Sequence, residues 1–278
     1  MRIYATQSEV SVHDGDRWSR VRDFSFDRLF RQRDPAKWLR SRVGRVRTAV
    51  TGRLRPPLES QEVWAAGVTY SRSRRARIEE SANEASVYDR VYRARRPEIF
   101  FKATPHRVVG DRAAVRIRRD SRWNVPEPEL ALAINCHGRI FGCAIGNDMS
   151  SRSIEGENPL YLPQAKIYDG CCALGPCLVV SDELPFTSAI EMHIRRAGHV
   201  VYSGRIPLSR MRRSPDQLVE YLRRDNSFPN GCYLLTGTGI VPPREFTLRD
   251  GDVIVISIEA VGVLTNRVRR LRGRDSSR

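Results

Sequence analysis

The chain has 278 residues, enough for one large core or for one main domain with a small addition, and too few for a long array of domains. Its hydrophobic content of 40% is that of an ordinary globular protein, and no apolar run approaches the roughly 18–20 residues that cross a bilayer. The first residues also lack the apolar stretch of a secretory signal, so we expect a soluble, cytoplasmic protein without a membrane partner.

The formal net charge of +16 at pH 7 raises the question of a nucleic-acid partner. Almost all of the positive charge is arginine, because the only lysines are Lys37, Lys102 and Lys166. The arginines are scattered without one dominant block, and a compositional bias toward arginine explains this distribution as well as a partner does. We therefore expect no specific nucleic-acid partner. Where a lysine remains in such an arginine-rich chain, it marks a place that needs a compact ammonium group.

Residues 1–60 are rich in Arg and Asp, show weak periodicity and end near paired prolines that favour an extended linker. We therefore expect a small N-terminal subdomain at 1–60 and a catalytic domain at 61–268. The basic, polar segment 269–278 is predicted to be a disordered tail.

An apolar run at 62–68 predicts a buried strand, and the charged stretch 73–95 is predicted to be helical. From Pro97 onward, short runs that are β-branched or alternate between apolar and polar residues predict a series of strands. These runs cover 98–103, 107–110, 114–118, 129–135, 139–148, 175–180 and, as the last core strand, 252–259.

Two hairpins and one helix complete the pattern. Residues 136–139 are predicted to turn between two strands, and 189–206 is predicted to be a hairpin that turns at Ala197 and Gly198. A helix is predicted at 215–225, with Ser214 as its cap and Pro215 in its first turn. Many short strands and few helices favour a mainly β (α+β) fold.

Glu127 and Glu129 stand two residues apart at the start of a predicted strand, where a period of two sends both side chains to one face. If this strand pairs with the next one as a hairpin, Asp148 lies just past the end of the second strand, beside both glutamates. Three oxygen donors favour Mg2+ over zinc, with Mn2+ or Ca2+ as alternatives. The competing interpretation is a solvated strand start, with Asp148 as an ordinary turn residue.

Several short motifs follow one another at specific spacings. They are GVTY at 67–70, PEIFFK at 97–102, E-P-E at 127–129, GNDMSSR at 146–152, QAK at 164–166 and TGTG at 236–239. Together they resemble the fumarylacetoacetate hydrolase superfamily over residues 62–266, and the longer strings around them are similar to its branch of 2-keto-3-deoxy-D-arabinonate (D-xylonate) dehydratases. Residues 1–60 show no clear likeness.

The resemblance implies a fumarylacetoacetate hydrolase-like β-rich roll, a homodimer or homotetramer, and a Mg2+ held by Glu127, Glu129 and Asp148. It also implies a metal-dependent lyase acting on a small 2-oxo acid in pentose catabolism. The expected reaction is the dehydration of a 2-keto-3-deoxy sugar acid, arabinonate or xylonate, to 2,5-dioxopentanoate.

Two residues match catalytic positions of the resembled branch. Glu98 matches its catalytic glutamate, and Lys166 matches an active-site lysine that orients or protonates substrate oxygens. An arginine after the aspartate can hold a carboxylate through two hydrogen bonds, and polar groups nearby can bind hydroxyls or an anion. The candidates for substrate binding are Arg152, Gln164, Tyr161 and Thr238.

One departure from the superfamily bears on the reaction. Hydrolases and decarboxylases of the superfamily carry a water-activating His and Glu on a lid, where this chain has Ser73 and Ala76. The missing pair disfavours hydrolysis of a C–C bond. Two alternatives stay open: a hydrolase, decarboxylase or isomerase of an acylpyruvate or related diketo acid, and a basic member without activity that binds nucleic acid or protein.

Overall fold

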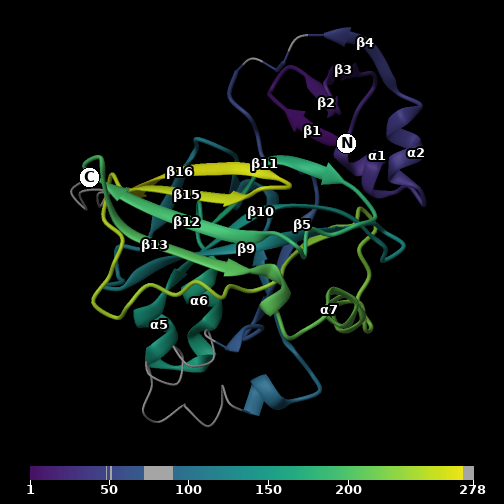
Figure 1. Cartoon of the computed structure of the whole chain (residues 1–278). Coiled ribbons are helices and arrows are strands. Elements are labelled where there is room, and N and C mark those ends of the chain that lie inside the picture. Colours follow the sequence, from purple (N-terminus) through teal and green to yellow (C-terminus); the bar gives the residue numbers. More distant parts are fainter. Residues whose placement is uncertain (48, 51, 72–89, 272–278) are drawn as a thin grey trace, which may run out of the picture.

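Two β-sheets form the framework of the computed structural model, which describes residues 1–47, 49–50, 52–71 and 90–271 (Figure 1). The strand order of the larger sheet is β4-β3-β2-β1-β11-β10-β9-β14-β5-β6, with β7 beside β11. The smaller sheet has the order β13-β12-β15-β16-β8. The prediction of a mainly β (α+β) fold is confirmed.

The larger sheet combines the N-terminal strands with strands from the middle of the sequence, as far as Leu235. Its strands are β1 (Arg2–Ala5), β2 (Val10–Asp14), β3 (Arg17–Val21), β4 (Val43–Arg47), β5 (Glu62–Gly67), β6 (Glu98–Ala103), β7 (Val108–Val109), β9 (Asn124–Ile134), β10 (Ile140–Ser151), β11 (Cys172–Val180) and β14 (Cys232–Leu235). The smaller sheet consists of β8 (Ala114–Ile117), β12 (Ala189–Arg196), β13 (His199–Pro207), β15 (Val253–Ile258) and β16 (Gly262–Arg270).

The helices are short and lie between strands. They are α1 (Phe26–Phe30), α2 (Pro35–Arg40), α5 (Arg152–Glu157), α6 (Leu162–Lys166) and α7 (Pro215–Leu222), with 3-10 turns η1 (Pro105–Arg107), η2 (Pro159–Tyr161) and η3 (Leu208–Arg210). Among the described residues, no helix has both the length and the apolar composition needed to span a bilayer.

The first sixty residues extend the larger sheet. Strand β1 pairs antiparallel with β11, with Ile3 opposite Leu178, and β2 to β4 follow as a meander. Helix α1 packs its Phe30 ring against the rings of Phe141 and Tyr233, at centroid distances of 4.8 and 5.3 Å. One sheet therefore runs across the boundary predicted near residue 60.

Both predicted turns are confirmed, and the helix predicted at 215–225 is present but ends at Leu222. Ala197 and Gly198 have φ values of 49° and 84°, as a two-residue hairpin turn with two left-handed residues requires. Gly138, with φ 81°, lies in the turn between β9 and β10. In α7, the Ser214 side chain accepts a hydrogen bond from the backbone N–H of Gln217. Most of the helix predicted at 73–95 lies outside the described residues, as do Ser73 and Ala76, and 90–93 is helical.

Three strand predictions were wrong in extent. Strand β9 begins at Asn124, five residues early, β10 continues to Ser151 instead of ending near Asp148, and β11 begins at Cys172, three residues early. Long antiparallel pairing between two buried strands outweighs the low strand propensity of the two prolines in β9. Strand β15 is also not the last, because β16 pairs with it and reaches Arg270, while residues 272–278 of the predicted tail lie outside the described residues.

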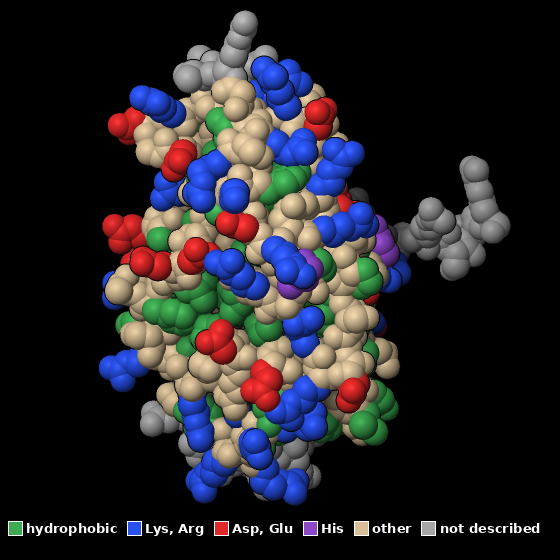
Figure 2. Space-filling model, turned by 90° about the vertical axis from the view of Figure 1, so that its right-hand side faces the viewer, with side chains coloured by type: hydrophobic (Ala, Val, Ile, Leu, Met, Phe, Trp, Pro, Cys, Tyr) green, Lys and Arg blue, Asp and Glu red, His purple; other side chains and the backbone are tan. Residues whose placement is uncertain are grey.

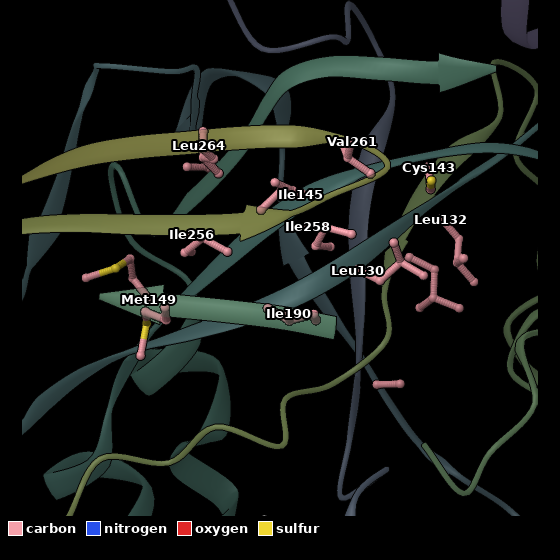
Figure 3. Close-up of a cluster of buried hydrophobic side chains, with 14 of the residues drawn as sticks. Leu130, Leu132, Cys143, Ile145, Met149, Ile190, Ile256, Ile258, Val261 and Leu264 are labelled. Atoms are coloured by element: carbon pink, nitrogen blue, oxygen red, sulfur yellow. The ribbon is translucent and has the colours of Figure 1, made fainter. Parts of the chain in front are cut away.

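The smaller sheet packs on one face of the β9–β10 ladder. Leu130, Ile145 and Met149 from the ladder meet Ile190 and Ile256 from the smaller sheet in a buried apolar cluster (Figure 3). Burial of each such side chain contributes roughly 1.5–3 kcal/mol. This packing immobilises the two strands that carry acidic residues on their other face.

Candidate metal centre

The carboxylates of Glu127, Glu129 and Asp148 meet in the interior of the β9–β10 ladder. Asp148 lies directly opposite Glu127, and Glu129 is opposite Gly146, so the three side chains share one face of the two strands. All three residues are buried, and one oxygen from each lies within 4.8 Å of the others. The predicted convergence is present, but Asp148 stands inside its strand and not beyond its end.

Three buried carboxylates repel one another unless cations lie among them. Burial, followed by the charges of Asp148 and Glu127, raises the pKa of Glu129 well above its ordinary value. The Lys166 ammonium lies 2.9 Å from Glu127 Oε2 and 3.0 Å from Asp148 Oδ2, and it donates to Ser150 Oγ at 2.7 Å. Lys166 therefore belongs to the acidic cluster, as its predicted role requires.

Arg152 follows directly from the end of β10. Ser151 caps α5, and the Arg152 guanidinium turns back, so that its Nη2 lies 2.8 Å from Glu127 Oε1. Its Nε is 3.7 Å from Glu155 Oε2, and Glu155 Oε1 is 3.6 Å from the Lys166 ammonium. The arginine predicted to bind a substrate carboxylate is thus paired with carboxylates of the protein itself.

Lys102, which the sequence marked only as a retained lysine, is a third cation of the cluster. It is fully buried on β6, and its Nζ lies 2.5 Å from Asp148 Oδ1. It also donates to the carbonyl oxygen of Met149 at 3.0 Å and to that of Lys166. Strand β6 is therefore fastened to β10 and to α6 at the carboxylates.

A small polar cleft opens beside the carboxylates. Glu98 lies in it against Gly67, where a Cβ on the glycine would stand 2.1 Å from Glu98 Oε2. Thr238 also lines it, while its hydroxyl donates to the carbonyl of Ile240. The lining residues are Ala66, Gly67, Val68, Glu98, Phe100, Glu127, Asp148, Arg152, Lys166, Gly237 and Thr238.

Two predicted substrate-binding residues lie elsewhere. Tyr161, in η2, is 42% exposed, and Gln164, in α6, is exposed as well. Neither side chain lines the cleft, although α6 also carries Lys166. Sequence reasoning did not single out Gly67 or Phe100 for the site. Phe100 could have been found, because it stands two residues after Glu98 on the same face of a strand.

The donor chemistry fits a hard divalent cation. The site offers three carboxylates, and oxygen ligands of this kind are those that Mg2+ and Ca2+ prefer. Counted formally, the acidic side chains Glu98, Glu127, Glu129, Asp148 and Glu155 exceed the basic side chains Lys102, Lys166 and Arg152 by two charges. One dication would balance this excess.

The chain is similar in sequence to known proteins. A family model described as fumarylacetoacetate (FAA) hydrolase C-terminal matches residues 63–269. The chain is 50% identical over 214 residues to the probable 2-keto-3-deoxyxylonate dehydratase of Haloferax volcanii, which covers 76% of this chain and 73% of the relative. It is 45% identical over 225 residues to the 2-dehydro-3-deoxy-D-arabinonate dehydratase of Saccharolobus solfataricus, covering 79% and 76% of the two chains.

The similarity extends to solved structures. A 2-keto-3-deoxy-D-arabinonate dehydratase complexed with magnesium and 2,5-dioxopentanoate matches with a TM-score of 0.87 at 36% identity, over 98% of this chain and 100% of that chain. Such coverage includes the N-terminal strands, for which the sequence alone showed no clear likeness.

Proposed function

The chain belongs to the fumarylacetoacetate hydrolase family, and from this membership we propose that it is a Mg2+-dependent dehydratase that converts a 2-keto-3-deoxy pentonate to 2,5-dioxopentanoate. The observation that carries the proposal is the buried Glu127, Glu129 and Asp148 cluster beside a cleft that also holds Glu98 and Lys166. The names of the relatives and the ligands of the matching structure support the same reaction.

Glu127, Glu129 and Asp148 would hold the metal. When bound there, Mg2+ supplies Lewis acidity that polarises the C2 carbonyl of the substrate and makes the C3 protons more acidic. Glu98 is the proposed base that removes a C3 proton, because its carboxylate lines the cleft and is not one of the three proposed metal ligands. Gly67 leaves the space that this carboxylate occupies.

The C4 hydroxyl leaves with a proton as water, which creates a C3–C4 double bond. Transfer of a proton from C5 to C3 then moves the double bond to C4–C5, and the resulting enol takes a proton at C4 to become the C5 aldehyde. Lys166 is proposed to orient and protonate substrate oxygens, since its ammonium lies at the edge of the cleft between two carboxylates. Arg152 and Thr238 are proposed to contact the substrate from the cleft wall. Gln164 and Tyr161 would need a rearrangement of α6 and η2 to do so.

Turnover of a defined substrate tests this proposal. Purified protein with Mg2+ should convert 2-keto-3-deoxy-D-arabinonate or D-xylonate to a semialdehyde, which an added aldehyde dehydrogenase oxidises with a measurable change in nicotinamide absorbance. Removal of divalent metal with a chelator should abolish the signal, and added Mg2+ should restore it. Turnover of an acylpyruvate in place of the sugar acids would contradict the proposal and support a hydrolase.

The cellular setting is part of the proposal. We place the enzyme in the cytoplasm as a homodimer or homotetramer, and light scattering during gel filtration measures the assembly. On the face shown in Figure 2, Lys and Arg side chains are interspersed with Asp and Glu. The expectation of no nucleic-acid partner stays a prediction, and binding of duplex or single-stranded nucleic acid at physiological salt would contradict it.

A further inference from the structure

Glu98, the proposed base, is the first residue of the strand at one end of the larger sheet. Within the described residues β6 pairs with β5 alone, and Glu98 lies opposite Gly67 in this pairing. Sheet pairing therefore holds Glu98 from one side. A base has to lie within hydrogen-bond reach of the proton that it removes, so the chain that leads into β6 bears on the reaction.

Residues 90–96 form this leading segment, and their own contacts hold them only loosely. Residues 90–93 are helical, the N–H of Ala94 donates to the carbonyl of Arg90, and residues 93–96 are exposed. The last carbonyls of a helix have no partner within it and need donors from elsewhere. Four of the seven residues are arginines, whose like charges repel one another in a compact arrangement.

Arg213 supplies the donors from the loop before α7. It is only 7% exposed, and its guanidinium donates to three carbonyls of segment 90–96. Nη1 donates to Arg95 at 3.2 Å, and Nη2 donates to Val91 at 3.1 Å and to Ala94 at 2.6 Å. A planar guanidinium can meet several acceptors at once, and its charge complements the partial negative charge at the end of a helical turn. Arg213 therefore caps segment 90–96.

The neighbouring Arg212 ties the same segment to the other wall of the cleft. Its guanidinium donates to the carbonyl of Tyr92 at 2.7 Å and lies 4.3 Å from the centre of the Tyr92 ring. Its backbone N–H donates to the carbonyl of Thr69 at 2.9 Å. Thr69 is fully buried and follows Gly67 and Val68, which line the cleft. The loop before α7 thus fixes the start of β6 relative to the end of β5.

We propose that Arg213 is a positioning residue, which caps segment 90–96 and thereby holds the start of β6 so that Glu98 lies against Gly67 in the cleft. This inference rests on the proposed function, because it takes Glu98 to be the base. Arg213 itself does not line the cleft. Its loss should therefore slow proton removal and leave metal binding intact, since a misplacement of about 1 Å can cost roughly 10²-fold in rate.

Arg213→Met tests the inference in the full chain with Mg2+. Methionine keeps an unbranched side chain but has no N–H group to donate to the carbonyls. With 2-keto-3-deoxy-D-arabinonate or D-xylonate as substrate, kcat should fall by about 10–100-fold, while KM and the affinity for Mg2+ stay within a few-fold. Steady-state kinetics and titration calorimetry measure these quantities. General damage to the fold would change all three.

Hydrogen exchange measures the capping itself and does not depend on turnover. In Arg213→Met, the amide protons of peptides that cover 90–103 should exchange about tenfold faster or more, because hydrogen bonds to a charged group are lost. Peptides from β9 and β10 should exchange as they do in the unaltered protein. A change spread over all peptides would indicate a structural role without a specific effect on Glu98.

Arg210→Met is the matched control, because Arg210 is an exposed arginine three residues earlier, in η3. It should change neither kcat nor exchange. A folded Arg213→Met with unchanged kcat, or with an equal loss of Mg2+ affinity, overturns the inference. If that variant does not fold, Arg213→Lys decides, because it keeps the charge but offers one nitrogen where the guanidinium uses two. Its kcat should fall by about 3–10-fold, since part of the hydrogen bonding remains, and an unchanged kcat overturns the inference.

The two proposals fail separately. If the unaltered protein turns over neither sugar acid, the dehydratase assignment is refuted. The same variants are then compared by the uptake of deuterium at C3 of 2-oxobutanoate in D2O, which needs only the metal and the base. Slower uptake in Arg213→Met would support the positioning role, and equal uptake, or none in the unaltered protein, would overturn it. Turnover of a sugar acid with unchanged kcat in Arg213→Met would refute the positioning role alone.

Discussion

The two faces of the β9–β10 ladder bury different kinds of side chain, apolar on one face and acidic on the other. On one face, Leu130, Leu132 and Ile145 pack against the smaller sheet, and no partner has to be matched to each side chain (Figure 3). On the other face, Glu127, Glu129 and Asp148 are buried as well, and cations from β6, α5 and α6 and one N–H group from the segment after β14 are placed against them.

The difference shows how the sheet can carry buried charge at all. An unpaired buried carboxylate is expensive, and the cost falls only when donors and counter-charges are supplied at close range. Burial of apolar side chains is not directional, so the apolar face stabilises the ladder without matched partners. The acidic face is therefore available for chemistry. Changes on the two faces should therefore affect different measurements.

The largest effect is expected from Glu129→Gln on the acidic face. Activity should fall by at least about 10²–10³-fold, since a charged group that stabilises the reacting centre is lost. Because burial and the neighbouring carboxylates raise the folded-state pKa of Glu129, its ionised form costs the fold stability above the ordinary pKa of a glutamate, so an uncharged glutamine should not lower the metal-free free energy of unfolding. Kinetic assays and thermal unfolding with and without Mg2+ measure both effects.

In this variant, Mg2+ should no longer raise the melting temperature as it does in the unaltered protein. A variant that unfolds at a much lower temperature without metal would show that Glu129 supports the fold, and the contrast between the two faces would then be lost.

Leu132→Ala tests the apolar face with the converse expectation. Removing a buried leucine side chain should lower the free energy of unfolding by about 2–5 kcal/mol, and urea denaturation measures it. The fraction that stays folded should keep its activity within a few-fold, because Leu132 points away from the carboxylates. A large loss of activity in fully folded protein would mean that the two faces are coupled.

The acidic face was the more predictable of the two from sequence. A spacing of two places Glu127 and Glu129 on one side of a strand, and a short turn brings the next strand back beside it, so that Asp148 had to come near. These are local relationships. Their exact register was not predictable, because the prolines beside the glutamates disfavour a strand that burial and pairing nevertheless impose.

Contacts between distant segments could not be read from the sequence. Lys102 contacts Asp148, which lies 46 residues later in the chain. The only sign of Lys102 in the sequence was that it is one of three lysines in an arginine-rich chain. The N-terminal strands and β16 were missed for another reason. Their outward positions are rich in charged residues, so few apolar residues mark the alternation, and pairing with β11 and β15 decides their conformation.

Gly67→Ala is expected to disturb the acidic face without touching a carboxylate of the cluster. A Cβ at this position would stand 2.1 Å from Glu98 Oε2, so the end of that flexible side chain must move. If Glu98 is the base, kcat should fall by about 10–100-fold, which is part of the roughly 10²–10⁴-fold that a positioned base contributes, because the base is displaced and not removed. Mg2+ affinity should stay within a few-fold. Steady-state kinetics and calorimetry separate the two. An equal loss of Mg2+ affinity would place the damage in the cluster itself.

The smallest effect concerns an ionisable group on the apolar face, where no counter-charge is supplied. Burial, and then proximity to Cys177, raises the pKa of the Cys143 thiol to about 12. In the unfolded chain this thiol ionises at an ordinary pKa, whereas the folded chain keeps its proton, so the unfolded state binds fewer protons above that ordinary value. The free energy of unfolding should therefore fall with rising pH by up to about 1.4 kcal/mol per pH unit through this one group.

Urea denaturation at pH 8 and at higher pH measures that slope, and Cys143→Ala should make it shallower whatever the variant does to stability at pH 8. Cys136→Ala is the control, because Cys136 is only partly buried in the turn after β9 and lies outside the apolar cluster. If both variants keep the slope of the unaltered protein, the Cys143 thiol ionises in the folded chain as readily as in the unfolded one. The two faces of the ladder would then not differ in how they treat a buried charge.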